Sequence, residues 1–202
     1  MAGRPKGTGG KAEELTKPEI RRIDKCLSGT THELRNKALF YLGLGSGMRI
    51  SEIVSLTIQD IRPHQILLNR IVLQKHSTKS NKSRTVTITQ QALDSVQDYL
   101  QFRELSQILQ PQDPLFPGQK DPRKPITPNG AKIVLKKMFQ DAAVPNASSH
   151  SLRRTHANSL RRLATDLLII QEQLGHSSLA TTQRYFQVDP IEVQNAIDKL
   201  KF

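Results

Sequence analysis

Residues 150–185 read HSLRRTHANSLRRLATDLLIIQEQLGHSSLATTQRY, and this stretch decides what the chain can be. It brings His150, Arg153, His176 and Tyr185 into one short region of helical pattern. His150 and Arg153 are three residues apart, so they share a face if the stretch is helical. Guanidinium, imidazole and phenol groups held together in this way would suit a phosphate in a substrate.

The apolar residues of the stretch recur at helical spacing, which predicts faces that pack the region against a core: Leu160, Leu163, Leu167, Ile170 and Leu174. Gly175 predicts a helix end, because glycine readily adopts the left-handed conformation that closes many helices. His176 would therefore lie at a helix boundary, and a new helix is predicted over residues 179–184.

Positive charge dominates the composition. The chain has 202 residues, enough for one sizeable core, with 30 Lys and Arg against 18 Asp and Glu and a formal net charge of +12. This excess predicts a polyanionic partner. Nucleic acid is favoured over a membrane, because no long apolar run and no lipidation motif is present.

Cysteine and histidine usage narrows the chemistry. Cys26 is the single cysteine, which excludes a disulfide within the chain and a cysteine-built zinc site. The six histidines form no His-Glu-x-x-His pattern and have no supporting carboxylate cluster, so we expect no metal and no cofactor. The start, MAGRPKGTGGK, lacks an apolar segment, so we expect no signal peptide and a cytoplasmic protein.

Residues 1–15 are glycine-rich and basic, and we expect them to form a flexible arm. Arg4 is predicted to enter a narrow A·T minor groove, whose negative potential attracts arginine. A solvated tail is the alternative. Thr16 and Glu19 form a capping-box pattern, so a first helix is predicted over residues 17–27.

A second helix is predicted over residues 32–44, followed by a tight Gly-Ser-Gly connection and another helix start. Arg49 lies just before that start, where the helix dipole already favours an anion. The cation therefore either pairs with an acid such as Glu52 or Asp60, or helps to bind an anion.

Residues 65–74 and 85–89 are rich in β-branched residues and predict two strands. The polar segment KHSTKSNKSR at residues 75–84 makes them a hairpin. Its cations are too many for purely structural roles, and we expect them to face DNA, one of them delivering a proton: Lys75, Lys79, Lys82 and Arg84. A solvated loop is the alternative for most of them.

Helical patterns return over residues 90–109 and 127–139, on either side of a proline-rich loop at residues 111–128. We expect Leu115 and Phe116 to anchor that loop. The helix at 127–139 has a basic face that is predicted either to contact DNA phosphates or to be simply solvated: Lys132, Lys136 and Lys137.

Ser148 or Ser149 is predicted to cap the helix that carries His150. An amphipathic stripe then runs through the last part of the chain, residues 189–202. No internal repeat is present. The patterns together predict a single, mainly α domain with a small antiparallel β-hairpin.

Four motifs together resemble the tyrosine recombinase, or phage integrase, family. GSGMRISEIVSL is similar to the family's first arginine box, and TKSNKSRTVTI is similar to its β-hairpin. HSLRRTHANSL matches its His-x-Leu-Arg box, and LGHSSLATTQRY matches its Leu-Gly-His box and nucleophilic tyrosine. The motifs follow the family order, so the resemblance implies the family's catalytic-domain fold over residues 16–188.

The resemblance implies a catalytic set that is carried by these motifs: Arg49, Lys79, His150, Arg153, His176 and Tyr185. The tyrosine would attack a DNA phosphate and form a 3′-phosphotyrosine link, without metal or ATP. Lys79 would protonate the leaving 5′-oxygen. Threonine and serine flank it where the family has glycines, so Lys75 and Lys82 stay open for that role.

The implied function is site-specific recombination of double-stranded DNA, by integration, excision or inversion. The protein would be a homo-tetramer on paired sites and weakly associated or monomeric without DNA, with residues 189–202 exchanged between subunits. Accessory DNA-binding proteins could assist. We expect the chain to be a catalytic domain alone, without the family's amino-terminal clamping domain, as in small invertase-type members, and a prokaryotic, phage, plasmid or mobile-element origin is expected.

Two other functions are compatible with the motifs. A type IB topoisomerase shares the nucleophile, the arginines and the lysine, but usually differs from the His-x-Leu-Arg pattern. A non-catalytic DNA-binding regulator could keep the fold, although the intact catalytic residues argue against it.

Overall fold

The structure, a computed structural model, describes residues 12–74, 83–163, 166–175 and 198 of the chain. Its first half contains α1 (Lys17–Leu27), α2 (Glu33–Ser46), α3 (Ile50–Val54), α4 (Ile58–Ile61), the 3-10 turn η1 (Pro63–Gln65) and the hairpin of β1 (Arg70–Leu73) and β2 (Arg84–Thr87). The second half contains α5 (Gln90–Glu104), α6 (Pro128–Asp141), α7 (Ser149–Arg162) and α8 (Leu167–Leu174). In this part of the chain the predicted fold class, mainly α with a small antiparallel sheet, is confirmed.

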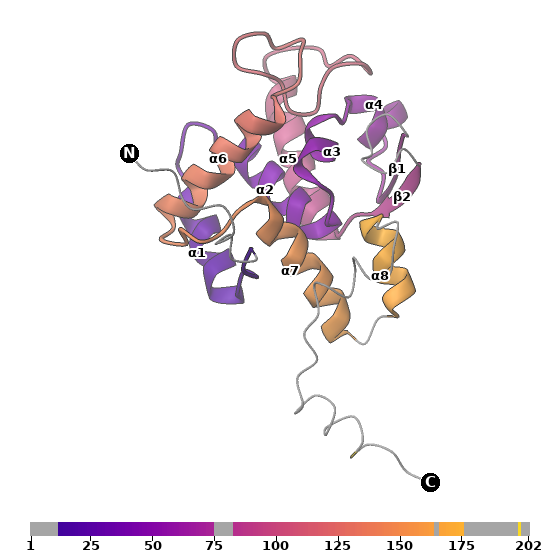
Figure 1. Cartoon of the computed structure of the whole chain (residues 1–202). Helices are drawn as coiled ribbons and strands as arrows, with labels where there is room; N and C mark the ends of the chain where they lie inside the picture. Colours follow the sequence, from indigo (N-terminus) through magenta and orange to yellow (C-terminus); the bar gives the residue numbers. More distant parts are fainter. Residues whose placement is uncertain (1–11, 75–82, 164–165, 176–197, 199–202) are drawn as a thin grey trace.

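Helix α2 is the centre of the arrangement, with α5 and α7 packed against it (Figure 1). Two of its glycines allow these close approaches. A Cβ added at Gly43 would come 2.7 Å from Cδ1 of Leu152 in α7, and one at Gly45 would come 2.7 Å from Cβ of Ala92 in α5. Side chains at either position would push the neighbouring helix away.

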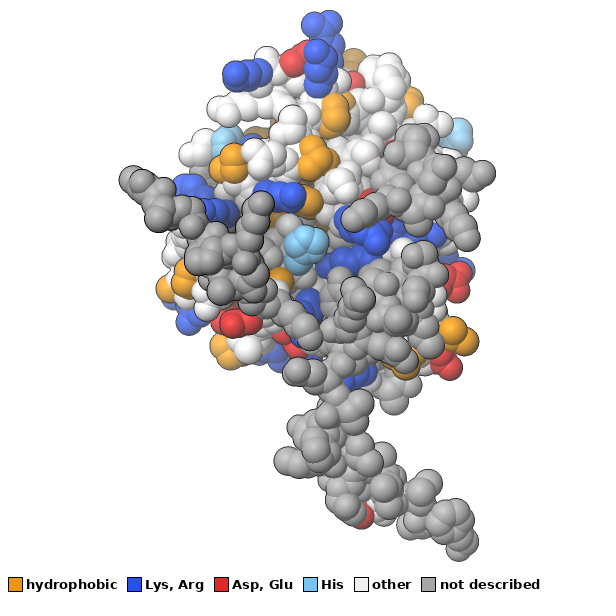
Figure 2. Space-filling model, viewed as in Figure 1, with side chains coloured by type: hydrophobic (Ala, Val, Ile, Leu, Met, Phe, Trp, Pro, Cys, Tyr) orange, Lys and Arg blue, Asp and Glu red, His pale blue; other side chains and the backbone are white. Residues whose placement is uncertain are grey.

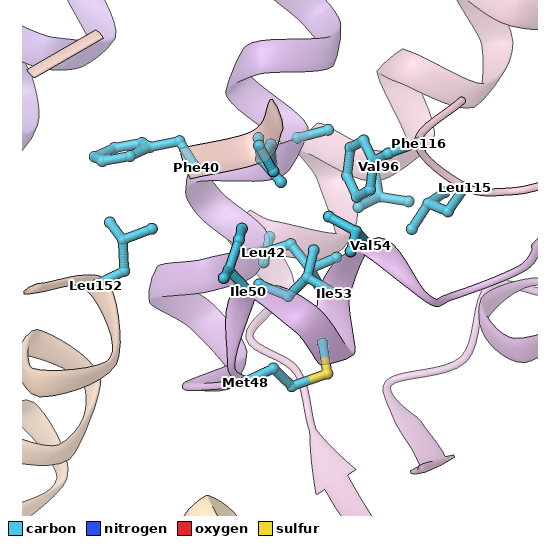
Figure 3. Close-up of a cluster of buried hydrophobic side chains, with 14 of the residues drawn as sticks. Phe40, Leu42, Met48, Ile50, Ile53, Val54, Val96, Leu115, Phe116 and Leu152 are labelled. Atoms are coloured by element: carbon cyan, nitrogen blue, oxygen red, sulfur yellow. The ribbon is translucent and has the colours of Figure 1, made fainter. Parts of the chain in front are cut away.

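One apolar core joins the two halves of the chain. Figure 3 shows part of it, where Leu42 of α2, Ile53 of α3, Val96 of α5 and Leu152 of α7 come together. Burial of such side chains removes apolar surface from water and is the main force that holds the helices together. The core reaches the residues that flank Arg49, because Met48 and Ile50 are both buried.

Several predicted local features are confirmed. The Thr16 side chain accepts from the Glu19 backbone N–H, and the Glu19 carboxylate accepts from the Thr16 N–H, so the capping box forms. Ser148 caps α7. The proline-rich loop is anchored by the fully buried side chains of Leu115 and Phe116.

Two elements are shorter than predicted. The first strand covers Arg70–Leu73 and not residues 65–74, because His64 and Gln65 take positive φ angles of 50° and 64° and form a turn. Helix α5 ends at Glu104 and not at residue 109. The side chains of Leu105 and Ile108 beyond its end are exposed and have no core to pack against.

The predicted apolar run from Leu160 to Leu174 does not form one continuous helical face. Helix α7 ends at Arg162, and Leu163 is 76% exposed. Asp166 then starts α8 by accepting a hydrogen bond from the Leu168 backbone N–H. A separate small cluster of Ala157, Ile170 and Leu174, with Leu160 against it, holds α8 to α7.

No helix in the described residues is long and apolar enough to cross a membrane.

Candidate active site

Arg49 lies at the junction between α2 and α3. Gly47 ends α2 in the left-handed conformation, with φ of 64°, and a Cβ there would come 2.6 Å from Cδ2 of His156. The chain then turns outward, and Arg49 takes the N-cap position of α3. Its side chain keeps 24% of its surface exposed, and one guanidinium nitrogen is anchored by an ion pair.

Glu52, in the first turn of α3, anchors this arginine. Its side chain is fully buried. Oε1 accepts from Nη1 of Arg49 over 3.0 Å, and Oε2 accepts from the Arg49 backbone N–H over 2.7 Å. The sequence had left open whether Arg49 pairs with an acid or serves an anion. The pairing with Glu52 is present, and the Arg49 side chain is still 24% exposed.

Arg84 is the second cation on the same carboxylate. Its Nη1 lies 3.1 Å from Oε1 of Glu52, and its Nη2 lies 3.1 Å from Oε2. Burial lowers the pKa of Arg84, the charge of Glu52 raises it and the charge of Arg49 lowers it again. An arginine stays protonated in such a setting, so the three groups have a net charge of about +1.

The position of Arg84 differs from the expected one. The sequence predicted a DNA-facing cation of the hairpin loop, but its side chain is only 8% exposed. The cause is strand alternation: Val86 and Ile88 point inward, so Arg84 points inward too, with Leu73 as its partner across the hairpin. This alternation was visible in the sequence and would have indicated the inward side chain.

Arg153 on α7 is almost fully buried, with 2% exposed. Nη1 donates to the carbonyl oxygen of Gly47 over 2.7 Å, and Nη2 donates to that of Leu174 over 2.6 Å. Both carbonyls lie at helix C-termini, where unsatisfied oxygens favour a cation. Arg153 therefore joins the end of α2, two residues from Arg49, to the end of α8.

The end of α8 contacts the same cluster. Gly175 has a φ of 64°, and a Cβ added there would lie 2.3 Å from Cδ and 2.4 Å from Nε of Arg84. Two residues earlier, Gln173 bonds the edge of β2 at the N–H and carbonyl oxygen of Thr87, and also bonds the Ser46 carbonyl oxygen. The predicted helix end at Gly175 is thus confirmed, and it lies against Arg84.

His150 occupies the first turn of α7 and is exposed. Its backbone N–H donates to Oγ of the capping Ser148. Because it precedes Arg153 by three residues on α7, the two residues lie on neighbouring positions of one helix face. In the view of Figure 2, Lys and Arg side chains gather in the middle of the visible face of the molecule, next to a histidine.

His156 belongs to the packing of this region. It is 8% exposed, and its Nδ1 lies 2.7 Å from the carbonyl oxygen of Leu44. Burial lowers the pKa of His156, the bond to Leu44 raises it and the nearby Arg153 charge lowers it. These effects favour the neutral imidazole, with its proton on Nδ1, which donates to the Leu44 carbonyl oxygen.

The remaining expected residues fall into two groups. Lys132, Lys136 and Lys137 are exposed on α6, and Lys137 pairs with Asp141 over 3.0 Å. The others lie outside the described residues: Arg4, Lys75, Lys79, Lys82, His176, Tyr185 and, apart from residue 198, the stripe of residues 189–202. Within the described ranges, no group of three His, Cys, Asp or Glu side chains could hold a metal ion.

Comparison with known proteins agrees with this architecture. The Phage integrase family model matches residues 13–192, and the chain belongs to that family. Tyrosine recombinase XerA of Pyrococcus horikoshii is 29% identical over 190 residues, which are 94% of this chain and 61% of that protein. The chain thus spans about three fifths of the length of this relative.

Solved structures show the same fold. A crystal structure of XerA recombinase matches with a TM-score of 0.75 and 22% identity, over 96% of this chain and 68% of that one. XerH site-specific recombinase, solved in a pre-cleavage complex with its difH substrate, matches with a TM-score of 0.71 and 24% identity, over 94% of this chain and 54% of that one. The expected tyrosine recombinase catalytic-domain fold is confirmed.

Proposed function

We propose that this chain is the catalytic part of a site-specific DNA recombinase, which cuts and rejoins strands through a phosphotyrosine link at Tyr185. The observation that carries the proposal is the convergence of two arginines at one helix junction. Glu52 holds Arg49, and the Gly47 carbonyl oxygen, two residues before Arg49, holds Arg153. Membership of the phage integrase family supports the same chemistry.

The arginines suit a phosphodiester under attack. Charge builds up on the non-bridging oxygens as the nucleophile adds, and a guanidinium offers forked, charge-assisted hydrogen bonds to them. Donors that are already anchored need little reorganisation during the reaction. Removal of one such donor typically costs about 10²–10³ in rate.

The proposed step conserves bonds and charge. The phenol oxygen of Tyr185 attacks phosphorus as its proton passes to a base, for which we propose His150. The bond from phosphorus to the 5′-oxygen breaks, and that oxygen takes a proton from Lys79. His176 donates a hydrogen bond to the phosphate. Attack by a different 5′-hydroxyl reverses these transfers and joins a new pair of strands, so neither ATP nor metal is consumed.

The DNA contacts and the assembly are part of the proposal. Lys132 and Lys136 on α6, and Arg4, Lys75 and Lys82 elsewhere, would contact phosphates or grooves. XerH, a structural relative, was solved on its DNA substrate, which supports duplex DNA as the ligand. We propose a tetramer on paired sites in a prokaryotic cytoplasm, with residues 189–202 exchanged between neighbours and accessory proteins supplying further DNA contacts.

The test is covalent capture on DNA from the source organism. Sheared DNA is incubated with the full chain, the mixture is denatured, and protein-linked fragments are isolated and sequenced at their ends. We expect ends that share one sequence, and expect Tyr185→Phe to give no covalent product while it still shifts DNA in a gel. Adducts formed by Tyr185→Phe would refute the nucleophile. Supercoil relaxation without strand exchange would favour a topoisomerase.

A further inference from the structure

Glu52 has its full set of hydrogen bonds. A carboxylate has about four lone-pair positions on its two oxygens. Two are used by the backbone N–H and Nη1 of Arg49, and two by Nη1 and Nη2 of Arg84. Arg84 therefore occupies one half of a buried anion, and Arg49 reaches it with a single side-chain nitrogen.

We propose that Arg84 is a positioning residue, which saturates Glu52 and so keeps the guanidinium of Arg49 turned toward the DNA phosphate. This inference rests on the proposed function. Without Arg84, two acceptor positions on a buried charge would lose their donors, which is costly in a dry environment. Arg49 is the adjacent cation, and its other N–H groups have no acceptor in the described part of the chain. It would rotate inward to form a forked pair and leave the phosphate.

The side chain of Arg84 is placed for this task at three points. Its backbone pairs with Leu73 in the hairpin. Its shaft passes Gly175, where a Cβ would come within 2.3 Å of Cδ. Its fork meets both oxygens of Glu52 at 3.1 Å. A lysine at this position would keep the charge but would offer one nitrogen instead of a fork.

Arg62 provides a matched control. Its side chain is 5% exposed, compared with 8% for Arg84. Both terminal nitrogens of Arg62 bond Glu104, and its Nε, like that of Arg84, is buried without a hydrogen-bond partner. Arg62→Met thus removes an arginine of similar burial, whose glutamate partner is 36% exposed and which has no contact with Arg49.

The first measurement needs no DNA. Phenylglyoxal modifies exposed guanidiniums, and mass spectrometry gives the modification rate of Arg49 in the full-length protein. We expect Arg84→Met to lower this rate at least threefold, Arg84→Lys to lower it too, and Arg62→Met to leave it within about a factor of 1.5. Circular dichroism and thermal unfolding identify the variants that remain folded. An unchanged Arg49 rate in folded Arg84→Lys would overturn the inference.

The second measurement is covalent capture at a site that the wild-type protein has defined. We expect Arg84→Met to lower the rate of adduct formation about 100-fold, the loss expected for one anchored phosphate donor. Arg62→Met should lower the rate of adduct formation less than threefold when the two variants are compared at a similar loss of Tm. Equal losses of the adduct-formation rate in the two variants would mean that Arg84 contributes only stability and does not position Arg49. If the wild-type protein forms no adduct on any DNA, the proposed function fails, while the Arg49 modification rates still decide the positioning role.

Discussion

Arg153 of α7 donates from Nη2 to the carbonyl oxygen of Leu174 over 2.6 Å, and this bond ties α7 to the last turn of α8. The same guanidinium bonds the Gly47 carbonyl oxygen at the end of α2. One side chain thus holds together two helix ends that are more than a hundred residues apart in sequence. Helix α8 otherwise depends on a small apolar cluster and on Gln173.

Arg153→Lys is expected to loosen α8 as well as to impair cleavage. A single ammonium group cannot span the carbonyl oxygens of Gly47 and Leu174, and it lacks a fork for phosphate. Hydrogen exchange should become faster in residues 167–175 and stay unchanged in α5. Arg154→Lys, a change in the adjacent and less buried arginine, is the control. Equal exchange in α8 of wild type and Arg153→Lys would contradict the bridging role.

Gly175→Ala is expected to destabilise the protein more than Gly29→Ala. Both glycines have positive φ, 64° and 77°, so each alanine costs about 1 kcal/mol from its backbone conformation. Gly29 has open space around it, whereas a Cβ at Gly175 collides with Arg84. The collision should add roughly 1–3 kcal/mol, as overpacking does. Urea unfolding of the two variants measures the difference, and equal losses would mean that Arg84 moves aside at no cost.

Gly175→Ala should also reduce adduct formation, because displacement of Arg84 disturbs Glu52 and Arg49. Gly29→Ala serves again as the control and should retain wild-type activity. Full activity in a destabilised Gly175→Ala protein would mean that the contact between α8 and Arg84 stabilises the fold but does not position the arginines.

Stability is expected to fall as the pH is lowered below about 6.5, the usual pKa of histidine in an unfolded chain. Burial lowers the pKa of His156 in the folded protein, so the unfolded state binds more protons in this range. The loss begins as pH falls through the unfolded pKa and ends below the folded pKa. Its slope is at most about 1.4 kcal/mol per pH unit for this one proton.

His156→Asn should remove this part of the pH dependence, since asparagine keeps a donor for the Leu44 carbonyl oxygen but does not titrate. His64→Asn, the same substitution at an exposed turn, is the control that shows whether loss of any histidine changes the slope. Urea midpoints at pH 7.5 and pH 5.5 supply the measurement. An unchanged slope in His156→Asn would assign the dependence to other groups.

DNA affinity is expected to fall steeply with salt, and the α6 lysines should account for part of the slope. Lys132 and Lys136 are exposed, one helical turn apart, and have no ion pair within the described residues. Replacement of either by Gln should lower the slope of log K against log salt concentration by roughly 1. Lys124→Gln, in the proline-rich loop, is the control that tests whether loss of any positive charge lowers the slope. If all variants have the same slope of log K against log salt concentration, α6 does not contact DNA.

Local rules were enough for much of the fold. The capping box at Thr16, the cap at Ser148 and the glycine that ends α8 depend on neighbours within four residues. Such features are encoded in short stretches and can be recognised there. The family motifs also identify the candidate residues, because the chemistry demands particular side chains in a particular order.

Strand and helix lengths were less predictable. Residues 65–68 have the composition of a strand, but the backbone N–H groups of Ile66 and Leu68 bond Pro63 and Ile61 instead of the hairpin partner. Residues 105–109 have helical spacing, but Leu105 and Ile108 are exposed. The spacing of Leu160 to Leu174 likewise could not reveal the break that Asp166 makes. Periodicity reports which residues are apolar, and burial decides which of them continue an element.

From the order of its residues alone, this protein could be assigned its fold class, its helix caps and the identity of its candidate nucleophile and arginines. The sharing of Glu52 by Arg49 and Arg84, and the reach of Arg153 from Gly47 to Leu174, emerged only with the folded chain. Packing decides which residues come close enough to bond a charged side chain. Arg84 and Glu52 are 32 positions apart in sequence, and Arg153 and Gly47 are 106 positions apart. Sequence spacing carries no record of such distances in space.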